Sequence, residues 1–146
     1  MNDAAKLPLA IETQAKPEDI SVLSDGLSRH SGAATGIRDG ELLCVFVRGG
    51  DQTVVGGAYG WTWGGGCYIR YLFVPEDMRG RGLGTRIMGE VEREARVRGC
   101  RQIILETHDF QAPNFDRGLG FSITGQVDDY PRGHSYLTMV KRLDGG

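Results

Sequence analysis

The spacing of apolar and polar residues changes along the chain, and each change marks a predicted element. Residues 68–74 form a short run of aromatic, aliphatic and β-branched side chains, which is typical of a largely buried strand. Residues 83–98 place apolar side chains four apart between charged ones, which predicts an amphipathic helix that ends before Gly99. The apolar positions of this helix are Leu83, Ile87, Val91 and Ala95.

The other segments predict an α/β order of β-α-β-β-β-α-β-α-β-β. Pro17 opens a first helix, followed by a small, polar connection at residues 31–36. Gly56 and Gly57 predict a bulge or a close backbone approach within a strand. A helical crossover makes the strands on either side of it parallel. The further strands are expected at residues 9–13, 41–48, 53–63, 102–107, 120–126 and 135–142.

A glycine-rich loop at residues 79–84, Arg-Gly-Arg-Gly-Leu-Gly, joins the central strand to the main helix. Glycines let the backbone approach a ligand and turn its N–H groups inward. The helix N-terminus adds partial positive charge, and Arg79 and Arg81 add full charges. The loop therefore predicts a site for an anionic group, most naturally a phosphate.

The spacing of the loop separates three kinds of phosphate site. A P-loop requires Gly-Lys-Ser/Thr, whereas Gly84 is followed by Thr85 and Arg86. A dinucleotide fingerprint lacks its last glycine, although Glu106 stands where the ribose-binding carboxylate would be. The third pattern, Arg/Gln-x-x-Gly-x-Gly/Ala, is matched without a gap from Arg79 to Gly84.

Composition narrows the function without naming it. With 146 residues, 40% hydrophobic and 25% charged, the chain has the length and balance of one soluble globular domain. A net charge of −2 argues against non-specific nucleic-acid binding, and no nucleic-acid partner is expected. No apolar run is long enough to predict a membrane-spanning segment. The cysteines are odd in number and widely spaced, which predicts reduced thiols in a cytoplasmic protein. These cysteines are Cys44, Cys67 and Cys100.

The third loop pattern resembles the pyrophosphate loop of the GCN5-related N-acetyltransferase (GNAT) family. Residues 110–121 resemble the short helix and following strand of that family, and Asp129-Tyr130-Pro131 with Gly133-His134 resembles its last loop. The resemblance covers residues 41–142. It implies one acetyltransferase domain over 1–146, in which we expect residues 1–10 to be a loose leader. It also implies a mixed sheet of six to seven strands, flanked by helices, with splayed central parallel strands.

The resemblance also implies the ligands and partners. Acetyl-CoA would be the cosubstrate, no metal is expected, and the acceptor would be an amine of a small molecule or peptide; a homodimer is compatible with the family. A backbone N–H near residues 72–74 would polarise the thioester carbonyl. The cofactor-binding residues implied are Leu72, Phe73, Val74, Arg79, Gly80, Arg81, Gly82, Leu83, Gly84, Thr85 and Asn114.

The candidates for the proton steps are Tyr130, His134 and Glu106. Histidine titrates near neutral pH and suits a base or a water relay; a solvated surface loop is the alternative for His134. Glu106 could be a buried base or a structural hydrogen-bonding group. Aromatic residues could wall the acceptor pocket, although such strand residues more often belong to a core or sheet surface: Trp61, Trp63 and Tyr68. Asp128 and Asp129 could attract a cationic amine, although paired acids in a loop are usually just solvated.

The chain departs from the family at Phe115-Asp116, where many members have Phe-Tyr. The tyrosine that commonly protonates the departing CoA thiolate is therefore absent. Asp116 would be ionised at neutral pH unless buried. It could contact the donor or cap a helix; we expect the cap, with Tyr130 or water as the acid.

These observations predict an acetyl-CoA-dependent N-acetyltransferase in which a primary amine attacks the thioester directly. Two alternatives stay open: a CoA-binding regulatory module without turnover, and a nucleotide-binding α/β domain.

Overall fold

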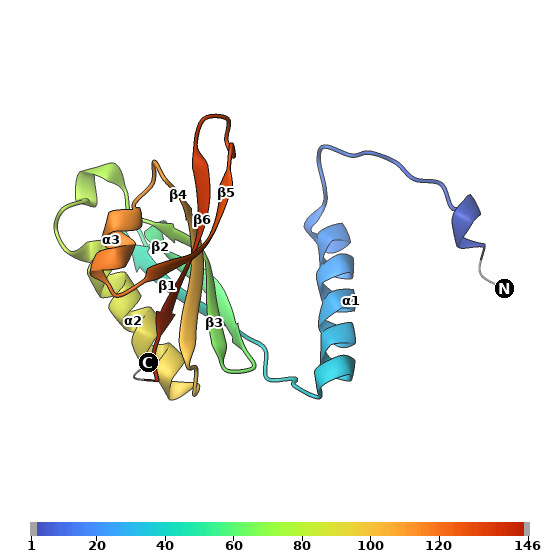
Figure 1. The fold of residues 1–146 in the computed structure, drawn as a ribbon, viewed down its shortest axis with the longest axis horizontal. Helices are drawn as coiled ribbons and strands as arrows, with labels where there is room; N and C mark the ends of the chain where they lie inside the picture. The colour runs from blue at the N-terminus through green and yellow to red at the C-terminus, as the bar shows by residue number, and fades with distance from the viewer. Residues whose placement is uncertain (1–2, 145–146) are drawn as a thin grey trace. The chain divides into compact units, whose positions relative to one another are not determined.

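The computed structural model describes residues 3–144. By its internal contacts the chain divides into two compact units, Met1–Ile37 and Arg38–Gly146. Figure 1 shows the elements, which are α1 (Pro17–Thr35), β1 (Glu41–Arg48), β2 (Val54–Trp63), β3 (Gly66–Phe73), α2 (Leu83–Val97), β4 (Gln102–His108), α3 (Pro113–Gly118), β5 (Ser122–Asp128) and β6 (Ser135–Arg142), with short 3-10 helices at Ala4–Lys6 and Glu76–Met78.

The first unit is built around α1. This helix begins at Pro17, as predicted, but it continues through residues 31–35, where a connection was expected. It stops at Gly36, which has a φ of +74° and donates its N–H to the carbonyl of Gly32. The strand expected at residues 9–13 is wrong, because a strand needs a hydrogen-bonded neighbour and none of the described strands pairs with this segment.

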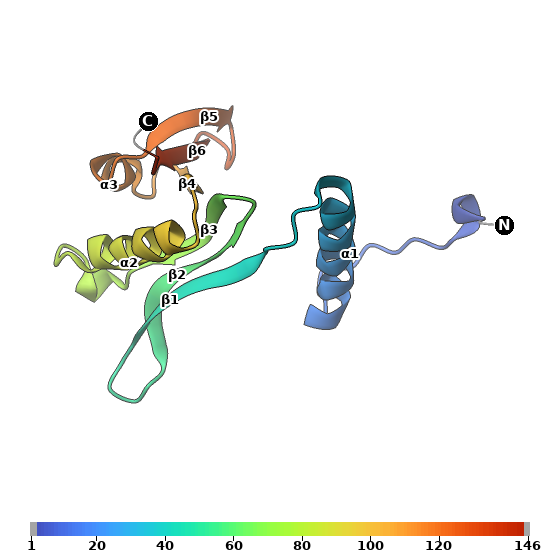
Figure 2. The same cartoon turned by 90° about the horizontal axis from the view of Figure 1, so that it is seen from below.

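The second unit is a six-stranded sheet in the order β1-β2-β3-β4-β6-β5. Among the strands of the described residues only β3 and β4 are parallel, and they are the central pair expected from the crossover helix between them. The strands predicted between residues 41 and 142 are all present, with some ends shifted by one or two residues. Figure 2 shows α2 lying along one face of the sheet, where it packs against β1, β2 and β3.

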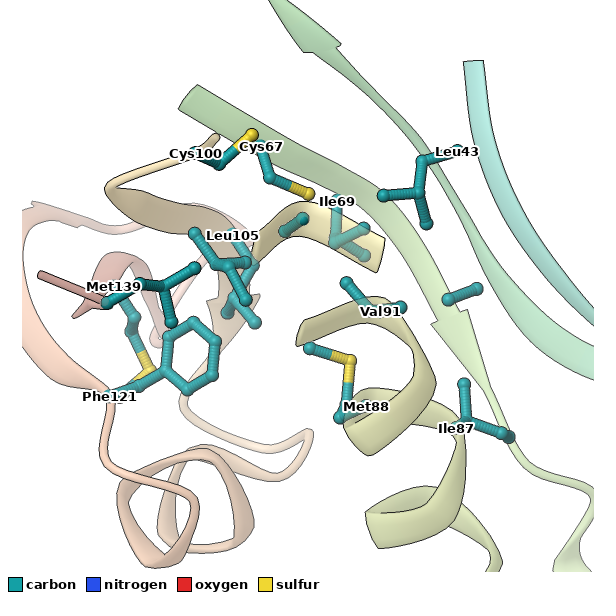
Figure 3. Close-up of a cluster of buried hydrophobic side chains, with 14 residues drawn as sticks. Leu43, Cys67, Ile69, Ile87, Met88, Val91, Cys100, Leu105, Phe121 and Met139 are labelled. Atoms are coloured by element: carbon teal, nitrogen blue, oxygen red, sulfur yellow. The ribbon is translucent and has the colours of Figure 1, made fainter. Parts of the chain in front are cut away.

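The core lies between α2 and the sheet (Figure 3). The predicted apolar positions Ile87, Val91 and Ala95 are buried there against strand residues such as Ile69 and Leu105. The three cysteines are free thiols, two of them on strands, in agreement with the sequence prediction.

Two strands approach so closely at Gly57 that a side chain could not fit. A Cβ atom placed there would lie 2.0 Å from the carbonyl oxygen of Val45, so only glycine is compatible with this packing. The neighbouring register shift in the β1–β2 ladder is the bulge that the Gly-Gly pair predicted.

The parallel pair opens into a fork. β3 and β4 are paired from Gly66–Gln102 to Ile69–Leu105, and the pairing then stops although both strands continue. At the same point β3 has a bulge, because Tyr59 pairs with Tyr71 and Gly60 with Ile69, leaving Arg70 without a partner on β2. A bulge bends its strand and increases the local twist. The two central strands are therefore splayed, as expected.

Candidate active site

A cavity of about 1050 Å³ occupies the fork between β3 and β4. One wall is the end of β3 and the segment after it, residues 69–74, and the other is residues 105–107 of β4. The glycine loop and the first turn of α2 line a third side, and residues 110–112 with Phe115 and Asp116 line a fourth. The edge of β3 beyond Ile69 that faces β4 has no paired strand among the described residues.

The glycine loop turns sharply into α2. Gly82 is the N-cap and has a φ of +80°, a left-handed conformation that other residues adopt at a cost. The first N–H groups of a helix have no partner within it, and those of α2 belong to cavity-lining residues Leu83, Gly84 and Thr85. Arg79 donates from Nε to the carbonyl of Val74 at 2.9 Å, which ties the loop to the end of β3.

The structure brings most of the predicted cofactor-binding residues to this cavity. Arg81 and Asn114 do not line it; the side-chain oxygen of Asn114 instead accepts a hydrogen bond from Arg117 at 3.4 Å. CoA binding by this set remains a prediction. The residues that do line the cavity are Leu72, Phe73, Val74, Arg79, Gly80, Gly82, Leu83, Gly84 and Thr85.

Glu106 lines the cavity immediately after the last β3–β4 pair. Its carboxylate accepts hydrogen bonds from the hydroxyls of Tyr68 on β3 and Tyr136 on β6. Burial, followed by the hydrogen bond to Glu106, raises the pKa of Tyr68, and the same causes raise the pKa of Tyr136 to about 12. Both hydroxyls therefore stay protonated at neutral pH and hold the carboxylate in place.

Tyr130 and His134 lie in the loop before β6 and do not line the cavity. His134 is exposed, and its Nδ1 lies 2.9 Å from a carboxylate oxygen of Asp109. The Tyr130 carbonyl contacts Nδ1 of His108 at 3.0 Å, and its exposed ring packs edge-on against Tyr136. Their catalytic roles remain predictions.

Asp116 is only 4% exposed, and it lines the cavity from α3. The expectation that it caps a helix is wrong: it lies inside α3, whose N-cap is Ala112. Burial raises the pKa of Asp116 to about 6. Phe115 of the same helix packs against α2, because an added Cβ at Gly84 would lie 3.0 Å from its ring.

An aromatic and charged surface lies at the fork on the sheet face away from α2. The ring of Trp61 meets Tyr68 edge-on at 5.0 Å, and Tyr59 stacks on Tyr71 at 5.9 Å. Arg70 donates from Nε to the Tyr71 hydroxyl at 3.1 Å. Neither Arg70 nor Tyr136 could be assigned to the site from sequence, because no local motif marks a bulge or the neighbouring strand.

The two acids suggested for attracting an amine, Asp128 and Asp129, accept hydrogen bonds from residues close to them in the sequence. Asp128 accepts hydrogen bonds from Gln126 and Ser135, and Asp129 accepts one from the Gly133 N–H at 2.9 Å. Within residues 3–144, no three His, Cys, Asp or Glu side chains are grouped so that they could hold a metal ion. No helix in that range is both long and apolar enough to cross a membrane.

Comparison with known proteins assigns the class. The model of the Acetyltransferase (GNAT) family matches residues 11–121. An acetyltransferase from Agrobacterium fabrum is 33% identical over 129 residues, which are 88% of this chain and 94% of the relative. The blasticidin-S acetyltransferase of Streptomyces morookaense is 34% identical over 107 residues, 70% of this chain and 76% of its own.

The fold agrees with this assignment. A crystal structure of an acetyltransferase from Agrobacterium tumefaciens superposes with a TM-score of 0.83 at 31% identity, covering 94% of this chain and all of that chain. The chain therefore belongs to the GNAT family of acetyltransferases, and it is an acyltransferase enzyme. Both the resemblance found in the sequence and the expected fold are confirmed.

Proposed function

We propose that this enzyme transfers an acetyl group from acetyl-CoA to a primary amine of a small molecule or peptide. The observation that carries the proposal is the cavity at the β3–β4 fork, which has the glycine loop and helix N-terminus along one side and Glu106 on another. The first side suits a pyrophosphate and the second suits an amine. Solved proteins of the same fold hold coenzyme A or acetyl coenzyme A, which supports the choice of donor.

The donor would be held by backbone groups. The N–H groups at the start of α2 would bind the pyrophosphate, favoured by the helix dipole. The pantetheine arm would lie in the fork and pair with the edge of β3 beyond Ile69, because that edge lacks a strand partner among the described residues. This geometry would direct the thioester toward Glu106.

The chemistry requires a free amine and a stabilised oxyanion. Glu106 would take one proton from the acceptor ammonium, directly or through a water, and pass it to solvent. The amine nitrogen would then attack the thioester carbon, with a backbone N–H of residues 72–74 donating to the developing oxyanion.

Collapse of the intermediate would break the C–S bond. The sulfur leaves with the bonding electrons as a thiolate. A thiolate with a pKa near that of free cysteine is a good leaving group, so it needs no acid from the protein and takes a proton from water. Tyr130 was the other candidate acid, but it lies outside the cavity lining. The second proton of the amine passes to solvent.

The test is an acetyl-CoA thiol-release assay across polyamines, amino acids, aminoglycosides and peptides, with mass spectrometry of the product. The proposal predicts that release of free thiol requires an amine and yields an N-acetylated product. Tight acetyl-CoA binding without amine-dependent release across the panel would contradict it.

A further inference from the structure

The fork places two opposite charges next to each other. Ile69 on β3 and Leu105 on β4 form the last pair of the parallel ladder, and the next residue on each strand is Arg70 and Glu106 respectively. Both line the cavity. A cation from one strand and an anion from the other therefore face the same space where the strands separate.

Both side chains lie on the sheet face away from α2. Ile69 and Leu105 are buried against the helix, so the alternation along β4 turns Glu106 to the opposite face, where Tyr68 reaches it. The bulge at Arg70 keeps this side chain beside Tyr71, whose ring stacks on Tyr59 of the same face. The Arg70 cation also opposes the rise in the pKa of Tyr68 that burial and Glu106 cause, which means that its charge acts on the Tyr68 hydroxyl.

The two charges do not neutralise each other. Glu106 accepts hydrogen bonds from two neutral tyrosines. Arg70 uses Nε for the Tyr71 hydroxyl, and no carboxylate in residues 3–144 lies within ion-pair distance of its guanidinium. A guanidinium binds a carboxylate through parallel N–H groups, and such charge-assisted contacts are the stronger hydrogen bonds.

We propose that the acceptor is an amino-carboxylate, with its amine at Glu106 and its carboxylate at Arg70. This inference rests on the proposed function and narrows it: the fork selects a zwitterion over a simple amine. The acceptor would approach from the aromatic face of the sheet, opposite α2. Arg70 is then a specificity-determining residue and takes no part in the acetyl transfer itself.

The experiment compares amino acids with their amides. Each of the twenty common amino acids and its amide is assayed for acetyl-CoA-dependent acetylation by the wild type, Arg70→Gln, Arg70→Lys and the control Arg93→Gln. Arg93 pairs with Glu90 on the exposed side of α2 and does not line the cavity. The measured quantity is kcat/KM for the acid divided by kcat/KM for its amide. The change in that ratio between wild type and variant cancels the different intrinsic reactivities of the two amines.

We expect the wild type to acetylate at least one amino acid, and Arg70→Gln to lower its acid-to-amide ratio about 10- to 100-fold. Arg70→Lys should retain part of the preference, and Arg93→Gln all of it. An unchanged ratio in Arg70→Gln overturns the inference, as does a panel in which no amino acid is acetylated. If the amides, or the other amines of the thiol-release panel, are acetylated while no amino acid is, the proposed function still stands; if no amine in either panel releases thiol, both fail.

Discussion

Replacing Glu106 by glutamine separates its catalytic role from its structural one. The carboxylate accepts hydrogen bonds from two tyrosine hydroxyls. A charged acceptor contributes about 1.5–3 kcal/mol per bond and a neutral one about 0.5–1.5 kcal/mol. The amide keeps one acceptor oxygen, and the other hydroxyl can rotate to accept from its NH₂ group. Because the amide also removes the cost of burying a charge, we expect unfolding free energy to fall by at most about 2 kcal/mol.

The effect on turnover should be much larger. An amide cannot take a proton from the acceptor, and general-base catalysis is worth about 10²- to 10⁴-fold. We expect kcat/KM of Glu106→Gln to fall by that factor, while the dissociation constant for acetyl-CoA changes little. The measurement is turnover with a confirmed acceptor across pH 6–9, together with chemical unfolding of the same protein.

The matched control is Glu92→Gln. Glu92 is a half-buried glutamate on α2 that pairs with Lys141 at 2.6 Å and lies outside the cavity. It should lose stability on a similar scale and keep its turnover. Turnover by Glu106→Gln within about threefold of wild type, with the same pH profile, would refute the assignment of Glu106 as the base.

Three further predictions concern the loop and the buried carboxyl. Gly82→Asp should weaken acetyl-CoA binding at least tenfold in calorimetry, because it adds negative charge beside the α2 N–H groups. The control Gly65→Asp lies outside the cavity, at a similar φ and with equally open space around it, and should bind acetyl-CoA normally. Equal affinities of the two variants would contradict the loop assignment. Gly84→Ala should lower the free energy of unfolding by about 1–3 kcal/mol, because the added methyl group meets the ring of Phe115 on α3. Gly89→Ala, on the same helix with no neighbour within 4 Å, should raise it by about 0.5–1 kcal/mol. The reverse order of stabilities would contradict the packing. Asp116 has a folded-state pKa raised to about 6, so the fold holds the proton more tightly than the unfolded chain and loses stability as pH rises from about 4 to 6. Asp116→Asn should therefore stabilise the protein at pH 7.5 by about 1–2 kcal/mol and should have little effect at pH 4. The gain is less than the pKa shift alone implies, because the carboxyl group borders an open cavity. An equal gain at both pH values in chemical unfolding would exclude this explanation.

The sequence predicted well the parts of the fold that depend on local pattern. The start of α2 at Leu83 and the bounds of β1 and β6 follow from periodicity and turn residues close in the chain. The glycine loop was found for the same reason, because its spacing and its flanking strand and helix are all contiguous. The strand expected at residues 9–13 failed because apolar alternation cannot say whether a partner strand exists.

The catalytic end of the site depends on contacts between distant segments. Tyr136 reaches Glu106 only because β6 lies next to β4, an order that no local pattern indicates. Asp116 is buried although no residue near it in the sequence indicates this, and the position of Arg70 comes from a bulge at an ordinary arginine. The sequence therefore predicted the glycine loop at one end of the cavity. The places of Tyr136, Asp116 and Arg70 at the site are visible only in the tertiary structure.

The claim that the β3–β4 fork holds the acetyl donor is tested most directly by a crystal structure with coenzyme A. We predict that the pyrophosphate binds the backbone N–H groups of residues 80–85, that the pantetheine arm pairs with β3 beyond Ile69, and that the sulfur points toward Glu106. Coenzyme A bound elsewhere on the protein, with the fork left open, would contradict the account.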